Sequence, residues 1–178
     1  MTKLDFISTY EISDATPQNP TLEVISADGF SHAIEEFIND RFRGIARVRC
    51  QVYSGSSVLV STEYAAYFFK ILLSEIYGRV FLNINISSDT ERLTIEISPE
   101  GTLPLCDKQL RQIIKIARNA GMQIISENEN LRLTLNFADA AIRRIYAISL
   151  SDGRAIMLYK LGEIFHCGAV CQTVNRRE

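Results

Sequence analysis

The chain has 178 residues, of which 47% are hydrophobic and 22% are charged, an ordinary composition for a globular protein. A chain of this length buries roughly 70% of its unfolded surface, so it needs neither disulfides nor a metal ion to fold. No apolar run approaches the roughly 20 residues of a membrane span, and the N-terminus lacks the pattern of a signal peptide. We therefore expect a soluble, cytoplasmic protein with no membrane segment.

The net charge of −2 is unevenly distributed. Acidic residues dominate positions 1–40, whereas basic residues outnumber acidic ones over 107–178. This asymmetry is compatible with an acidic partner and with an ordinary solvated face. A pI near 5.8, without a cluster of basic residues and interleaved aromatics, argues against binding to nucleic acid.

In chain order, the first half predicts short strands around one helix. Strands are expected at 4–10 and 21–26, on either side of a linker at 13–20, and the sequence Ala27-Asp28-Gly29 predicts a break. Apolar residues at helical spacing then predict a helix from Phe30 to about Phe42. Strict alternation predicts a half-buried strand at 46–53, which a turn connects to a strand at 58–60.

The second half predicts two more helices and three more strand pairs. A helix at 63–78, with Thr62 as its N-cap, is apolar nearly all round and should lie deep in the domain. Strands follow at 80–86 and 93–97, and a helix capped by Asp107 ends at Gly121. Further strands are expected at 122–126 and 131–137, and the Ser-Asp-Gly sequence predicts a hairpin of 144–150 with 155–160.

This order of elements predicts an α+β, two-layer α/β sandwich: a mixed sheet with helices on one face. The helical and alternating spacings predict a single core, formed by Leu72, Leu73, Ile76, Ile95, Ile113, Ile114, Ala117, Ile124 and Leu133.

Four stretches of the sequence resemble the ATPase domain of sensor histidine kinases, the Bergerat fold. A helix is followed by the strands of 48–60 and the next helix. The family's N-box is similar to residues 69–79, which read Phe-Lys-Ile-Leu-Leu-Ser-Glu-Ile-Tyr-Gly-Arg. Residues 93–101 resemble the family's strand that ends in Asp-x-Gly-x-Gly. Residues 110–127, followed by 131–137, resemble the helix and two strands that close the domain. The resemblance covers about 30–137 and implies a histidine kinase-like ATPase fold.

The positions that match the family's nucleotide site have changed. The N-box asparagine, which helps to hold Mg²⁺, corresponds to Glu75, and the aspartate that accepts a hydrogen bond from adenine corresponds to Pro99. Gly101 matches the first glycine of its box, but Leu103 stands at the second. No glycine-rich phosphate turn fits between Gly101 and Asp107, and the Asp107 carboxylate should repel a nucleotide at the helix start.

Other chemistry finds little support in the sequence. His32 is faintly similar to the family's phosphorylated histidine, but the two-helix hairpin that should present it is missing, so the polar edge of a helix is the better interpretation. The cysteines Cys50, Cys106, Cys167 and Cys171 suit reduced thiols. The stretch from His166 to Cys171 is a metal half-site without its other half, because Cys50, Cys106 and His32 stand singly.

The resemblance and the departures together predict a degenerate, pseudokinase-like domain of a two-component system that acts through a protein partner, without a catalytic residue or a cofactor. A homodimer is compatible with this prediction. One alternative is a divergent but functional histidine kinase domain that binds Mg-ATP, with Glu75 and Gly101 at the cofactor and Glu75 on the metal, so enzyme activity stays open. A second alternative is an unrelated α+β ligand-binding or assembly module. We expect N-terminal strands and a linker at 1–29, the ATPase-like domain at 30–137 and a C-terminal hairpin extension at 138–178.

Overall fold

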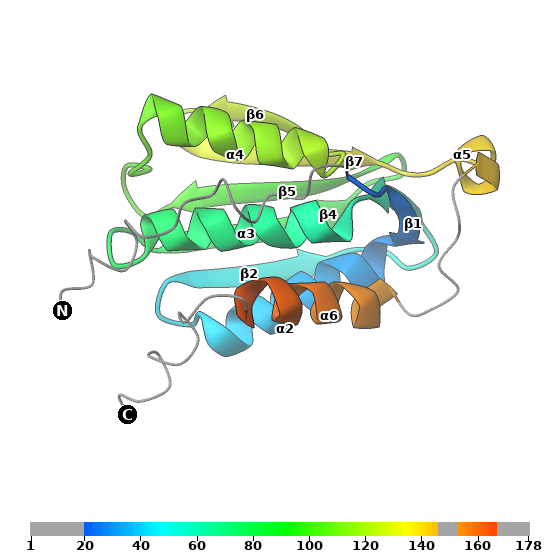
Figure 1. Cartoon of the computed structure of the whole chain (residues 1–178), viewed down its shortest axis with the longest axis horizontal. Coiled ribbons are helices and arrows are strands. Elements are labelled where there is room, and N and C mark those ends of the chain that lie inside the picture. Colours follow the sequence, from blue (N-terminus) through cyan, green and yellow to red (C-terminus); the bar gives the residue numbers. More distant parts are fainter. Residues whose placement is uncertain (1–19, 146–152, 167–178) are drawn as a thin grey trace.

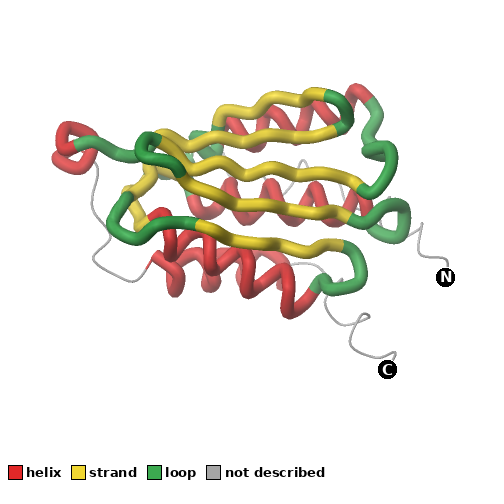
Figure 2. Tube along the Cα trace, turned by 180° about the vertical axis from the view of Figure 1, so that it is seen from behind, coloured by secondary structure: helices red, strands yellow, loops and turns green. Residues whose placement is uncertain are grey.

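A computed structural model of the chain describes residues 20–145 and 153–166. These residues form a mixed sheet with helices on one face (Figures 1 and 2). The elements are β1 (Glu23–Ser26), α2 (Ala27–Arg41), β2 (Ala46–Gln51), β3 (Ser57–Val60), α3 (Thr62–Ile76), β4 (Leu82–Ser88), β5 (Arg92–Pro99), α4 (Asp107–Asn119), β6 (Gln123–Glu127), β7 (Asn130–Asn136), α5 (Ala140–Ile145) and α6 (Gly153–His166). The predicted two-layer α+β class is confirmed.

Five of the described strands form the main sheet, in the order β2-β4-β5-β7-β6. The β2 strand runs parallel to β4, and the other neighbours are antiparallel. The strands predicted at 46–53 and 58–60 therefore do not pair with each other, because β3 pairs with β1 in a separate two-stranded sheet. Alternation along one strand shows which side is buried, but it does not specify the neighbour.

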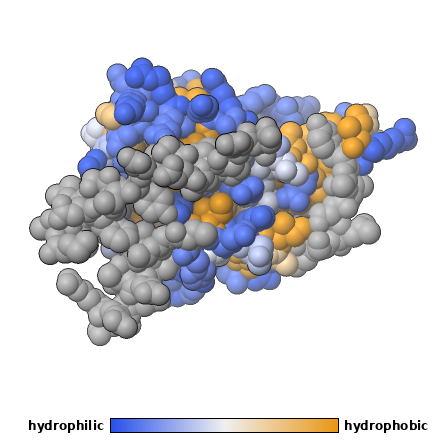
Figure 3. All heavy atoms as spheres, viewed as in Figure 1, coloured by the Kyte–Doolittle hydropathy of each residue, from blue (hydrophilic) through white to orange (hydrophobic). Residues whose placement is uncertain are grey.

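The core lies between the sheet and the helices, and α3 is at its centre. Twelve of the 15 residues of α3 are buried, as its apolar sequence predicted. Seven of the nine predicted core residues are buried, whereas Ile114 and Ile124 are only partly so. In α4 the buried stripe runs through Ile113, Ile116 and Ala117, and the hydrophilic side of the helix faces solvent at the top of the molecule (Figure 3).

The predicted C-terminal hairpin is wrong, because residues 153–166 form the helix α6. Met157, Leu161 and Phe165 recur every four residues, which places them on one helical face that is buried in the same core. This helix packs against α2 and α3, and the Lys70 ammonium of α3 donates a hydrogen bond of 2.8 Å to the carbonyl oxygen of Ile164. Residues 146–150 of the predicted hairpin lie outside the described residues, as does the strand predicted at 4–10.

The predicted break at 27–29 is also wrong, because these residues form the first turn of α2. A Cβ on Gly29 would lie 2.7 Å from the backbone nitrogen of Arg154, so this glycine allows α6 to approach α2 closely. A Cβ on Gly153, at the predicted hairpin turn, would lie 2.7 Å from the Ser26 hydroxyl oxygen and 3.1 Å from the Ser26 backbone nitrogen. Both glycines mark contacts between backbones rather than chain reversals.

Two helices begin one residue earlier than their predicted caps imply. Ser61 is the N-cap of α3, where its hydroxyl accepts a hydrogen bond from the Tyr64 N–H, and Cys106 is the N-cap of α4. Asp107 is therefore the first residue of α4 and not its N-cap. None of the helices in the described ranges has the length and apolar character that a membrane span requires.

Candidate functional site

The sequence-predicted site lies where α3, the end of β5 and the start of α4 come together. Glu75 is near the C-terminal end of α3, and Gly101 follows β5 in the short segment that leads to α4. Gly101 has a φ of +113°, a conformation that favours glycine, and a Cβ there would meet no atom within 4 Å. The turn geometry alone therefore accounts for this glycine.

The Glu75 carboxylate is engaged within the protein. It accepts a short hydrogen bond from the side-chain amide of Gln109, in the first turn of α4. Partial burial raises the pKa of Glu75, while Arg79 acts in the opposite direction. The amide oxygen of Gln109 in turn accepts a hydrogen bond of 2.9 Å from the backbone N–H of Cys106.

These contacts engage the N-terminus of α4 at the Cys106 N–H. A helix start offers unpaired N–H groups and a positive dipole end to an anion. Here the Gln109 side chain occupies the Cys106 N–H, and the exposed Asp107 carboxylate adds negative charge to the first turn. This helix start is poorly suited to a polyphosphate.

The segment between β5 and α4 is short and is held at several points. The side chain of Leu103 is buried in the core, and its N–H donates a hydrogen bond of 2.9 Å to the Glu129 carboxylate. The Arg79 guanidinium donates to the Pro104 carbonyl oxygen at 3.3 Å. This segment connects β5 directly to α4, and its buried leucine packs inward.

The structure also shows where Pro99 and His32 lie. Pro99 is the last residue of β5 and pairs in register with Leu82. Because a proline side chain has no polar atom, this position offers no side-chain acceptor for an adenine amino group. His32 lies on the partly exposed side of α2, as the sequence analysis predicted. Glu75 of α3 therefore contacts Gln109 of α4, whereas His32 lies on α2 and belongs to another part of the fold.

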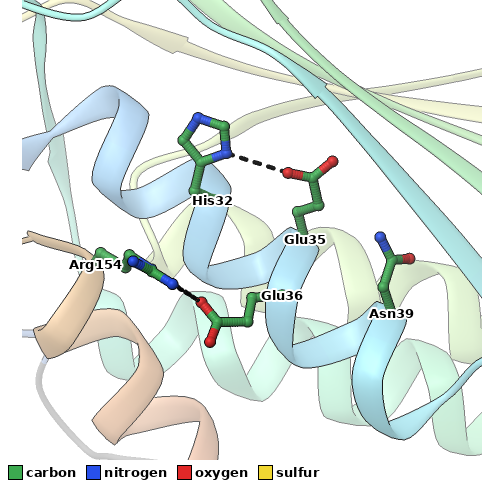
Figure 4. A pocket seen from close by; sticks show the side chains of 5 residues that line it. All are labelled: His32, Glu35, Glu36, Asn39 and Arg154. Atoms are coloured by element: carbon green, nitrogen blue, oxygen red, sulfur yellow. Dashed lines mark hydrogen bonds and ion pairs between the residues drawn. The ribbon is translucent and has the colours of Figure 1, made fainter.

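A cavity of about 450 Å³ lies beside α2, away from Glu75 (Figure 4). It is lined by His32, Glu35, Glu36, Asn39 and Arg154. The Arg154 guanidinium of α6 forms an ion pair with Glu36, whereas His32 and Glu35 contact each other on the other side of the helix (Figure 4). Sequence reasoning did not identify this cavity, because α6 forms one of its walls.

The sequence matches no family model, and no curated protein matches it significantly. Solved structures that resemble the fold include histidine kinases. They include AdeS of Acinetobacter baumannii (12% identity, TM-score 0.45, 76% of this chain and 75% of that one). The catalytic domain of ThkA is similar at 8% identity, with a TM-score of 0.45 over 66% of this chain and 96% of that one. A histidine kinase of Burkholderia phymatum is similar at 10% identity, with a TM-score of 0.41 over 67% and 72%.

These neighbours come from the family that the sequence motifs resemble. Because the alignments are weak, we take the fold class from the element order and the sheet topology. Over 30–137 the helices and strands follow one another in the order that the resemblance implied, although β2 and β3 do not pair with each other. The structure itself shows a mixed-sheet α+β fold, and the neighbours carry no conclusion about the chemistry of this chain.

Proposed function

We propose that this chain is a degenerate histidine kinase-type ATPase-like domain that acts in signal transduction through protein contacts, without ATP turnover. The observation that carries this proposal is the chain of contacts from Glu75 to Gln109 to Cys106. One side chain, Gln109, contacts both the carboxylate that would bind Mg²⁺ and the Cys106 N–H, at the helix end that would meet the phosphates. Nucleotide binding would have to break both contacts.

The energetic terms all oppose a nucleotide. A hydrogen bond to a charged group contributes about 1.5–3 kcal/mol, which is lost if Glu75 exchanges Gln109 for a metal ion. An unpaired adenine amino group at Pro99 costs roughly 1–3 kcal/mol. The Asp107 carboxylate interacts favourably with the positive end of the α4 dipole by about 0.3–1 kcal/mol, and a phosphate would compete with this interaction. Losses of 4 kcal/mol move a micromolar ligand to about millimolar affinity.

The sheet face that none of the described helices covers is a candidate surface for a protein partner. Its central row, in register across five strands, consists of Arg49, Asn85, Glu96, Arg132 and Ile125. Four of these side chains are polar, and Arg132 forms an ion pair of 3.1 Å with Glu96. Ile125 is 53% exposed in their midst. We propose that a cytoplasmic partner or a second copy of the chain contacts this face.

A thermal melt with and without millimolar Mg-ATP tests the proposal. Ligand at 100 times its dissociation constant adds about 2.7 kcal/mol of stability, which corresponds to roughly 5–10 °C for a chain of this size. We expect the melting temperature to equal that with MgCl₂ alone.

A rise of several degrees that disappears in Glu75→Gln would overturn the proposal. It would establish the divergent, functional ATP-binding domain, with Glu75 as the metal ligand. The variant is a suitable control because its amide oxygen can still accept the hydrogen bond from Gln109. Sedimentation of the wild-type chain over a range of concentrations separates self-association from a monomer that needs another partner.

A further inference from the structure

Three potential metal ligands meet where α2 crosses the edge strand β2. His32 and Glu35 are three residues apart on α2, and the Nδ1 atom of His32 lies 3.1 Å from Oε2 of Glu35 (Figure 4). Cys50 belongs to β2, on the side that also buries Ala46 and Val48. One ligand atom from each of His32, Glu35 and Cys50 lies within 4.8 Å of the other two.

Hydrogen bonds to the backbone of β2 fix α2 against this strand. The Oε1 atom of Glu35 accepts a hydrogen bond of 3.1 Å from the Cys50 N–H, which leaves Oε2 directed to His32. One turn further along α2, the Asn39 amide forms two hydrogen bonds of 2.8 Å with the N–H and the carbonyl oxygen of Val48. The position of α2 on the strand edge is thus set by groups other than a metal ion.

We propose that His32, Glu35 and Cys50 form a binding site for a zinc-like transition-metal ion. A tetrahedral zinc ion with bonds of about 2.0–2.3 Å needs its ligand atoms about 3.3–3.6 Å apart. The Nδ1 atom of His32 and Oε2 of Glu35, 3.1 Å apart, are close to this separation. Because the three ligand atoms lie within 4.8 Å of one another, metal binding would require them to move by about 1 Å. A nitrogen, oxygen and sulfur ligand set favours zinc over Mg²⁺ or Ca²⁺.

The cavity beside α2 supplies the fourth coordination position. His32 and Glu35 line this cavity of about 450 Å³, which has room for water or a small ligand on the metal. Glu36 lines it too, but its carboxylate is held by Arg154. The bound ion would carry one carboxylate, one thiolate and one neutral imidazole, so its two positive charges are balanced, and the thiol proton passes to solvent.

Cobalt binding to a chain in which Cys50 is the single cysteine tests this site. The background carries Cys106→Ser, Cys167→Ser and Cys171→Ser, which removes the thiols of the half-site at the C-terminus. We expect one Co²⁺ per chain, with the strong near-ultraviolet absorption of a cobalt thiolate, and displacement by one equivalent of Zn²⁺.

Substitutions in the same background separate ligands from neighbours. His32→Gln and Glu35→Gln should each weaken Co²⁺ binding at least about tenfold, since even indirect partners of metal ligands contribute that much. Glu35→Gln keeps an oxygen for the Cys50 N–H, and circular dichroism checks that both variants fold. Glu36→Gln, one residue away on the same helix, should leave the affinity unchanged.

Two results would overturn the metal site: a folded chain that gives no thiolate absorption with millimolar Co²⁺, or an absorption that His32→Gln leaves intact. Neither bears on nucleotide binding, because the ligands are remote from the Glu75 contacts and the proposal does not rest on the proposed function.

Discussion

The close contact between α2 and α6 predicts that Gly29→Ala destabilises the protein although alanine is the better helix former. The new Cβ would lie 2.7 Å from the backbone nitrogen of Arg154 and 3.2 Å from the carbonyl carbon of Gly153. Both atoms belong to backbone, so α6 must shift as a unit. Overpacking of this kind costs about 1–3 kcal/mol, against a helix-propensity gain of up to about 1 kcal/mol.

Gly162→Ala is the matched control, because it makes the same change inside α6. There the nearest atom to a Cβ is a side-chain carbon of His166 at 4.0 Å. We expect Gly162→Ala to stabilise by up to about 1 kcal/mol and to exceed Gly29→Ala in stability by about 1–3 kcal/mol. Urea denaturation measures both, and hydrogen exchange in 153–166 should rise in Gly29→Ala alone. Equal stabilisation by both substitutions would refute the packing of α6 on α2.

Three further predictions concern the core, the site and the sheet edge. Leu72→Ala, at a fully buried position, should cost about 2–5 kcal/mol in urea denaturation, and a cost below 1 kcal/mol would contradict its place in the core. Burial raises the pKa of Glu75 above its ordinary value of 4.5, so wild-type stability should fall as pH rises through the folded-state pKa; Glu75→Gln should lack this decline, and parallel pH profiles would refute it. Asn39→Leu removes two hydrogen bonds to the backbone of Val48 and should lower the free energy of unfolding by about 1–3 kcal/mol. Unchanged stability would contradict a stabilising role of these hydrogen bonds at the edge strand β2.

The periodicity of apolar residues correctly predicted those elements whose burial follows from the pattern of their own residues. The apolar sequence of 63–76 placed α3 in the interior, and alternation placed Ile95 and Leu133 on the buried side of the sheet. The failures involve partners that are distant in sequence. Gly29 and Gly153 look like chain breaks locally, and only the approach of α6 to α2 explains them. The parallel pairing of β2 with β4 likewise has no local signal.

The candidate site was predictable in part for the same reason. The residue types at Glu75, Pro99 and Asp107 indicated a weakened nucleotide site before any contact was known. Gln109 carries a local signal that sequence reasoning missed, because a glutamine three residues after an N-cap often caps a helix. Its contact with Glu75 spans 34 residues and has no such signal.

The ligands of the proposed metal site divide similarly. The spacing of His32 and Glu35 places them on one side of a helix, which the sequence alone can show. Cys50 joins them through the packing of α2 against β2, which no local pattern indicates.

Calorimetric titration of the wild-type chain with Mg-ATP is the most direct measurement of whether the nucleotide position is closed. We predict only heats of dilution up to millimolar nucleotide, because Gln109 occupies both Glu75 and the start of α4. A one-to-one isotherm with micromolar affinity would contradict the account, since such binding requires a phosphate site and a metal ligand that we expect these contacts to weaken.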